Sequence, residues 1–200
     1  MINPGGCVGS TCNVNYSSNT FKVGKVSNFN YMAHSMGLNP ATVATIASLE
    51  TESTGINTGC SSLDTPCDTL GAGICQVGKA MFDNWNASSN NIFIWCGDIC
   101  GSKYINNLAL CADFLLSAFK KLQNLGYNDQ IQMMAMAGTA WNGNACGHSS
   151  NTFYPWTGGG AYGYYLPGSN QLTRYGSSAG AIFKSSGYVG TGVFDTSITL

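Results

Sequence analysis

Residues 105–126, INNLALCADFLLSAFKKLQNLG, place apolar side chains at the spacing of an α-helix. One stripe of such a helix carries Leu108, Cys111, Leu115 and Phe119. Gly126 then supplies a C-terminal stop. Residues 128–143 repeat the helical pattern after an Asn-Asp cap, and strands do not alternate with helices in this central region. We therefore expect a mainly α fold with a helical core.

Two shorter helical patterns precede that segment. In residues 28–37, one side of a helix carries Tyr31, Met32 and Met36. Pro40 then stands at a first-turn position that a following helix permits. Over residues 41–50, helical spacing joins Val43, Ile46, Ala47 and Glu50, so the glutamate ends an otherwise apolar face. From periodicity alone, the more common arrangement is a carboxylate turned to solvent.

The two ends of the chain differ from this helical region. Residues 1–26 are loop-rich, and residues 176–200 are rich in Gly and Ser and lean toward β structure, as a hairpin on the flank or as a linker. Between these small β or irregular ends we expect one domain over residues 27–175. The 200 residues, 44% of them hydrophobic, are enough to bury one substantial core.

Charged side chains are sparse. Asp, Glu, Lys and Arg make up 8% of the residues, the net charge is -1, and no basic cluster exceeds Lys120-Lys121. Such a surface produces no field that would attract a polyanion, so we expect no nucleic-acid partner. No apolar run is long enough to span a bilayer, and we expect no transmembrane segment.

Nine cysteines lie mostly in loops rich in Gly, Ser, Asn and Pro. That number is high for a reducing compartment, so we expect a disulfide-bonded, extracytoplasmic protein that is secreted, periplasmic or virion-associated. The spacings at Cys7/Cys12 and Cys96/Cys100 are not those of zinc ribbons, and we expect no metal. The odd number leaves at least one thiol, and Cys75 and Cys111 are the candidates because both fall within apolar patterns.

Four short motifs follow one another along the chain: IASLET at 46–51, GICQV at 73–77, NLALCADFL at 107–115 and AWNGN at 140–144. With YMAHSMGLNP upstream, they resemble the ordered motifs of the lysozyme-like lytic transglycosylases and goose-type lysozymes, over about residues 28–145. The chain departs from the usual motifs of that family at Thr51, Ile74-Cys75, Cys111, Phe114 and Trp141. Most of these departures preserve size or character.

The resemblance implies a lysozyme-like α+β fold around a glycan-binding groove. It also implies one catalytic glutamate that cleaves the β-1,4 bond between MurNAc and GlcNAc of peptidoglycan, with no cofactor. When the family motif is aligned forward from Ile46, its catalytic glutamate falls on Glu50. Alignment backward from residues 55–57 places it on Glu52 instead. We prefer Glu50, because partial desolvation on an apolar stripe holds a carboxyl group protonated near neutral pH.

Further site residues follow from the same resemblance. We expect Gln76 and the pair Trp141-Asn142 to line the cleft, and Tyr162 and Tyr165 to stack on sugars. A lytic transglycosylase manages with one carboxyl group, whereas an inverting hydrolase needs a second one roughly 6.5–9.5 Å from the acid. The candidates for a second carboxylate are Glu52, Asp64, Asp68 and Asp83.

Three classes of function fit these patterns. The first is a peptidoglycan lytic transglycosylase, with a peptidoglycan hydrolase as its variant, acting on glycan strands for a larger secretion or virion assembly. The second is a catalytically silent glycan-binding module. The third is a disulfide-rich adhesin or toxin, which predicts that Glu50 is exposed and far from Gln76 and Trp141.

Overall fold

The computed structural model of the chain describes residues 26–50, 71–88, 93–95, 98–99, 104–142, 152–153, 164–165, 172–186 and 192–200. The helices are α1 (Val26–Ser35), α2 (Pro40–Glu50), α3 (Lys79–Ser88), α4 (Tyr104–Asn124), α5 (Gln130–Trp141) and α6 (Arg174–Ser185). The strands β1 (Thr152–Phe153) and β2 (Tyr164–Tyr165) pair antiparallel, with Thr152 opposite Tyr165. The expected mainly α class is therefore confirmed.

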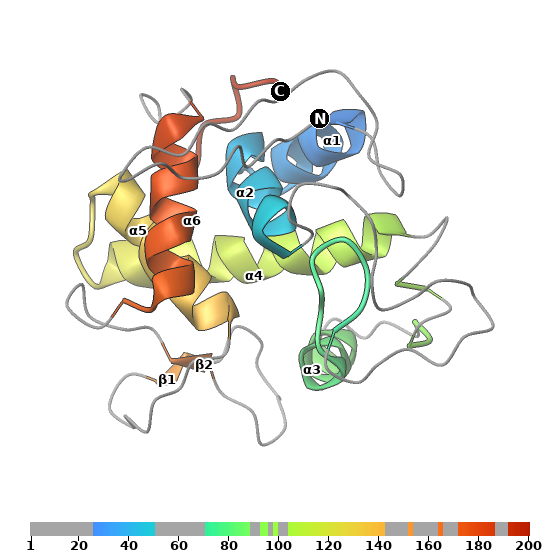
Figure 1. The fold of residues 1–200 in the computed structure, drawn as a ribbon. Helices are drawn as coiled ribbons and strands as arrows, with labels where there is room; N and C mark the ends of the chain where they lie inside the picture. Colours follow the sequence, from blue (N-terminus) through green and yellow to red (C-terminus); the bar gives the residue numbers. More distant parts are fainter. Residues whose placement is uncertain are drawn as a thin grey trace.

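The long helix α4 extends across the molecule and contacts α1, α2 and α5 (Figure 1). The stripe expected from its sequence is fully buried, with no exposed surface on Leu108, Cys111, Leu115 or Phe119. Helix α2 lies deeper than expected, because every residue from Pro40 to Ser48 is buried rather than one face alone. Within the described ranges, no helix combines the length and the apolar character needed to cross a bilayer.

The helix ends follow the local sequence. Gly37 and Gly126 adopt left-handed backbone (φ 71° and 89°) just beyond α1 and α4, as glycine does where a helix stops. Asp129 caps α5 by accepting hydrogen bonds from two backbone N–H groups of its first turn. One expectation for α1 is wrong: Tyr31 does not share the buried side of Met32 but is 66% exposed.

Helix α6 corrects the expectation of β structure after residue 175. The segment is helical to Ser185, with Thr173 as its N-cap, and the boundary expected after residue 175 falls inside this helix. Gly176 has no room for a side chain, since a Cβ there would collide with the hydroxyl of Thr139 and the carbonyl of Ala135 on α5. Glycine disfavours a helix on its own, but here it lets two helices pack closely.

Residues 192–200 form no hairpin, and the segment is attached to the core at several points. Val193 is fully buried, and its carbonyl accepts a hydrogen bond from the Asn39 N–H at 2.9 Å. Its own N–H donates to Oε1 of Gln130 on α5. The ring Nε2 of His34 lies 2.6 Å from the carbonyl oxygen of Ile198, to which it donates. His34 therefore has the structural role that fits its lack of any acid partner in the sequence.

Candidate active site

Glu50 is the last residue of α2, the most deeply buried helix of the core. The residue as a whole is only half-buried, but its carboxyl group lies largely out of water. Its Oε1 accepts two hydrogen bonds, one from the indole Nε1 of Trp141 at 3.1 Å and one from the phenol of Tyr175 at 2.7 Å. The end of α2 thus presents a carboxyl group that two aromatic side chains hold by one oxygen.

Trp141 ends α5 and is 5% exposed. Its ring meets Phe114 of α4 edge to face, with centroids 5.1 Å apart. With so little free surface, the indole is placed to shield and orient the acid, and it offers little area to a sugar. Trp141 therefore lies beside Glu50, as expected, and it contacts the carboxyl group of Glu50 directly.

Tyr175 is a site residue that sequence reasoning missed. It lies in the first turn of α6, which starts from the Thr173 cap, and its hydroxyl reaches Glu50 from 125 residues along the chain. Burial first, and then the charge of Glu50, raise the pKa of Tyr175 well above its usual range. The phenol therefore stays neutral and donates. A capping threonine just before the tyrosine was the only local signal for a helix start here.

Burial raises the pKa of Glu50 above its usual 4.5, although the hydrogen bonds from Tyr175 and Trp141 act in the opposite direction. Desolvation disfavours the charged carboxylate, whereas the two donors favour it. Because desolvation dominates, the carboxyl group keeps its proton to a higher pH than an exposed glutamate would. A glutamate poised in this way is suited to general acid catalysis.

Gln76 lies in a tight loop, residues 71–77, that α4 holds in place. Ala72 and Val77 form an antiparallel bridge across the loop, and Gln76 is the single non-glycine residue of the described chain with positive φ (48°). Asn107 of α4 donates from Nδ2 to the carbonyl of Ala72 and accepts the Cys75 N–H at Oδ1. The Gln76 amide itself donates to the Gly73 carbonyl at 2.9 Å, so it helps to shape the loop.

The loop brings a thiol close to the acid. Cys75 and Cys111 are both fully buried and are not in disulfides, as expected for the candidate free thiols. Burial, then the neighbouring Cys111 and then the charge of Glu50 raise the pKa of the Cys75 thiol well above its usual range. Glu50, Tyr175 and the two thiols thus interact electrostatically in one buried region.

The other candidate residues fall into three groups. Asn142 is exposed and follows α5 as its C-cap, next to Trp141. Tyr165 is described only as backbone of β2. The remaining candidates, Glu52, Asp64, Asp68 and Tyr162, lie outside the described residues.

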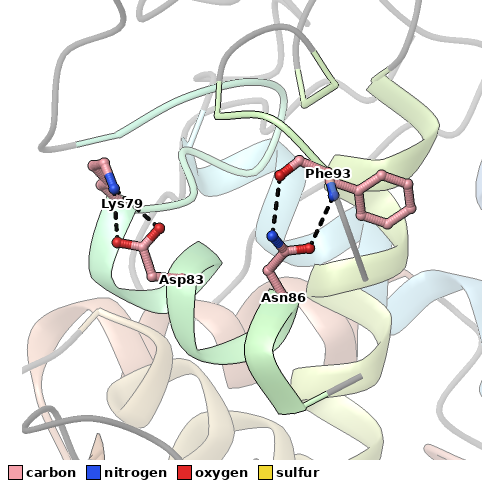
Figure 2. Close-up of polar contacts among 4 residues, drawn as sticks. All are labelled: Lys79, Asp83, Asn86 and Phe93. Atoms are coloured by element: carbon pink, nitrogen blue, oxygen red, sulfur yellow. Dashed lines mark hydrogen bonds and ion pairs between the residues drawn. The ribbon is translucent and has the colours of Figure 1, made fainter. Parts of the chain in front are cut away.

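Asp83 is the one candidate for a second carboxylate inside the described ranges. It lies on the exposed side of α3, where both its oxygens accept hydrogen bonds from Lys79 one turn earlier (Figure 2). The shorter distance is 2.7 Å, and both side chains are about half exposed. This is an ordinary ion pair on a helix surface, not a carboxylate aimed at a buried acid.

A shallow hollow of about 470 Å³ lies between α5 and α6, lined by Asp129, Gln132, Ser177 and Lys184 among others. Its lining extends to Ala135 in the middle of α5 and to Leu172, three residues before Tyr175. Glu50, Trp141 and Tyr175 are not among the lining residues. Within the described ranges, no three His, Cys, Asp or Glu side chains are grouped as metal ligands would be.

The arrangement can present one proton at the end of α2. Both donors among the described residues approach Oε1, so the proton of the neutral carboxyl group belongs on Oε2. No protein-family model matches the chain, and comparison with curated proteins and with solved structures found no significant similarity.

Proposed function

We propose that the protein is a peptidoglycan lytic transglycosylase of lysozyme-like fold, with Glu50 as its acid and base. The observation that carries the proposal is the desolvated carboxyl group of Glu50, whose pKa is raised and whose Oε1 is held by Trp141 and Tyr175. The substrate is the β-1,4 bond between MurNAc and GlcNAc. The order of the sequence motifs around these residues supports that choice.

The chemistry needs one carboxyl group used twice. Glu50 gives its proton to the glycosidic oxygen as the bond breaks, and the sugar left behind has oxocarbenium character. The resulting carboxylate takes the proton of the 6-hydroxyl group of the same MurNAc, whose oxygen closes onto the anomeric carbon as a 1,6-anhydro ring. Hydrogen bonds to Oε1 strengthen as charge develops on the carboxylate, so Tyr175 and Trp141 favour the transition state.

A peptidoglycan hydrolase is the alternative within the same class. It requires a second carboxylate, or a water held by one, on the other side of the sugar. The Lys79 pair and the exposure of Asp83 give no support to that residue in this role. We favour the transglycosylase because Glu50 alone suffices for its chemistry, whereas Asp83, the one candidate for a second carboxylate among the described residues, is paired with Lys79.

The other two classes of function, an adhesin or toxin and a silent glycan-binding module, agree less well with the surroundings of Glu50. An adhesin or toxin without a glycan role predicts an exposed Glu50 distant from Trp141, and the carboxyl group is instead buried and bonded to Trp141. A silent glycan-binding module has no need to keep an acid desolvated with two donors on it. We propose an extracytoplasmic location, where peptidoglycan is found, and action for a larger secretion or virion assembly.

Mass spectrometry of the fragments released from purified peptidoglycan tests the proposal. Wild type should release fragments that end in anhydro-MurNAc, and Glu50→Gln should lose at least about 100-fold in rate, since a general acid contributes roughly 10²–10⁴-fold. Asp83→Asn is the matched control and should keep wild-type activity. Reducing ends would identify a hydrolase instead, and binding without any release would identify the silent module.

A further inference from the structure

Two buried thiols from different elements lie in contact near Glu50. Cys75 comes from the loop 71–77 and Cys111 from the middle of α4, and neither has any exposed surface. Both are free, and Cys111 is close enough to Cys75 to raise the pKa of its thiol. Two neighbouring thiols can be oxidised together, with the loss of two electrons, to form a disulfide bond.

The backbone around Cys75 is already fixed against the face of α4 that carries Cys111. Asn107 stands one helical turn before Cys111, so the two side chains share a side of the helix. The Oδ1 of Asn107 accepts the Cys75 N–H at 2.9 Å, a contact that involves neither sulfur atom. Native packing of the loop therefore brings Cys75 to the side of α4 that carries Cys111, and a bond between these two thiols is the one that the fold accommodates.

We propose that Cys75 and Cys111 are a disulfide-forming pair that fastens the loop 71–77 to α4 when the protein meets a small-molecule disulfide such as oxidised glutathione. One protein thiolate attacks the glutathione disulfide and releases one glutathione thiolate. The second protein thiolate then attacks the protein sulfur of the mixed disulfide and releases the other. The protein pair loses two electrons, glutathione gains them, and the two thiol protons pass to the released thiolates.

The burial of the pair sets when this reaction occurs. The thiolate is the reacting form, and burial keeps the Cys75 thiol protonated in the folded protein. Exchange is therefore slow once the loop has packed, and the bond forms during folding, while the loop is still open. Closing it brings the two sulfur atoms to about 2.05 Å from each other. The bond is independent of the proposed activity.

Peptide mapping of the full chain tests the proposal directly. The protein is refolded with a mixture of reduced and oxidised glutathione, or with reductant alone, then alkylated and digested without reduction by trypsin and an aspartate-specific protease. Residues 68–79 and 104–112 then each carry a single cysteine, Cys75 and Cys111 respectively. These two peptides should be linked after oxidative refolding and separate after reductive refolding. Recovery of both peptides alkylated and unlinked after oxidative refolding would overturn the proposal.

Thermal unfolding gives a second measurement. Oxidative refolding should raise the Tm of wild type by about 5 °C or more above that of the Cys75→Ala/Cys111→Ala double variant refolded in the same way. The control is reductive refolding, in which that difference should shrink or reverse. A protein that shows the linked peptides but cleaves no peptidoglycan keeps this proposal and loses the proposed function. Protein that cleaves peptidoglycan but gives unlinked peptides keeps the proposed function and loses the proposal of a disulfide.

Discussion

Tyr175 donates its phenolic hydrogen to Oε1 of Glu50 over 2.7 Å, and this bond joins the first turn of α6 to the last residue of α2. It makes α6 part of the candidate site and not merely a helix on the outside of the core. The site thus has a phenolic hydroxyl, supplied by a helix far along the chain from Glu50.

Removal of this hydroxyl should change both the pKa of Glu50 and the rate. The bond from Tyr175 lowers the pKa of Glu50, so Tyr175→Phe should raise it further and move the alkaline limb of the pH-rate profile to higher pH. We expect kcat to fall roughly 10- to 100-fold, as for the loss of a hydrogen bond to a charged group. Tyr31→Phe, at an exposed tyrosine, is the control. An alkaline limb that stays in place would contradict this account.

The raised pKa of Glu50 also affects stability. Below about pH 4.5 the glutamate is protonated in both the folded and unfolded states, whereas above it the unfolded chain releases the proton first. Stability contributed by the protonated group is therefore lost as the pH rises through the folded-state pKa. Urea denaturation should show Glu50→Gln gaining stability relative to wild type between pH 4 and pH 8. A difference that is constant with pH would argue against a desolvated carboxyl group.

Asn107 should carry much of the stability of the loop 71–77. Truncation by Asn107→Ala leaves the buried Cys75 N–H without its partner and removes one of two hydrogen bonds to the Ala72 carbonyl, which still accepts the Val77 N–H. We expect a loss of about 2–4 kcal/mol in the free energy of unfolding. Asn106→Ala is a matched control on the same helix, where a single part-buried bond to the Asp98 carbonyl is lost, and it should cost about 1 kcal/mol. Equal losses in the two variants would contradict the role given to Asn107.

Gly176 should resist a substitution that normally stabilises helices. Gly→Ala within a helix gains roughly 0.5–1 kcal/mol when there is space. Here the added methyl group meets Thr139 and Ala135, so Gly176→Ala should lower the free energy of unfolding by about 1–3 kcal/mol. Activity should fall as well, because α6 moves and takes Tyr175 with it. Ser177→Ala, at the next and exposed position, should have neither effect.

The parts of the fold that could be predicted are those in which neighbouring residues act together. The stripe of α4 follows from helical spacing, and the Asp129 cap and the Gly126 stop follow from backbone chemistry within a few residues. The place of Glu50 at the end of an apolar helix came from the same spacing. Each of these features depends on residues within one or two helical turns.

The parts that could not be predicted depend on contacts between distant segments. Helix α6 has the Gly and Ser content of a poor helix former, and it is the close approach to α5 that makes those small residues suitable. The bond from Tyr175 to Glu50 has no local pattern at all. Because tertiary packing decided both features, the Gly and Ser content of the C-terminal region favoured β structure, and no local pattern indicated the residue that holds the acid.

The separation of Glu50 and Tyr175 has a consequence for a chain still on the ribosome. Elongation at about 5–20 residues per second places roughly 6–25 s between the synthesis of the two residues, which stand 125 positions apart. Throughout that interval the carboxyl group has no phenol to hold it, and α6 does not yet exist to cover it. A nascent chain therefore contains its acid early, and the hydrogen bond that tunes this acid forms only after Tyr175 has been made.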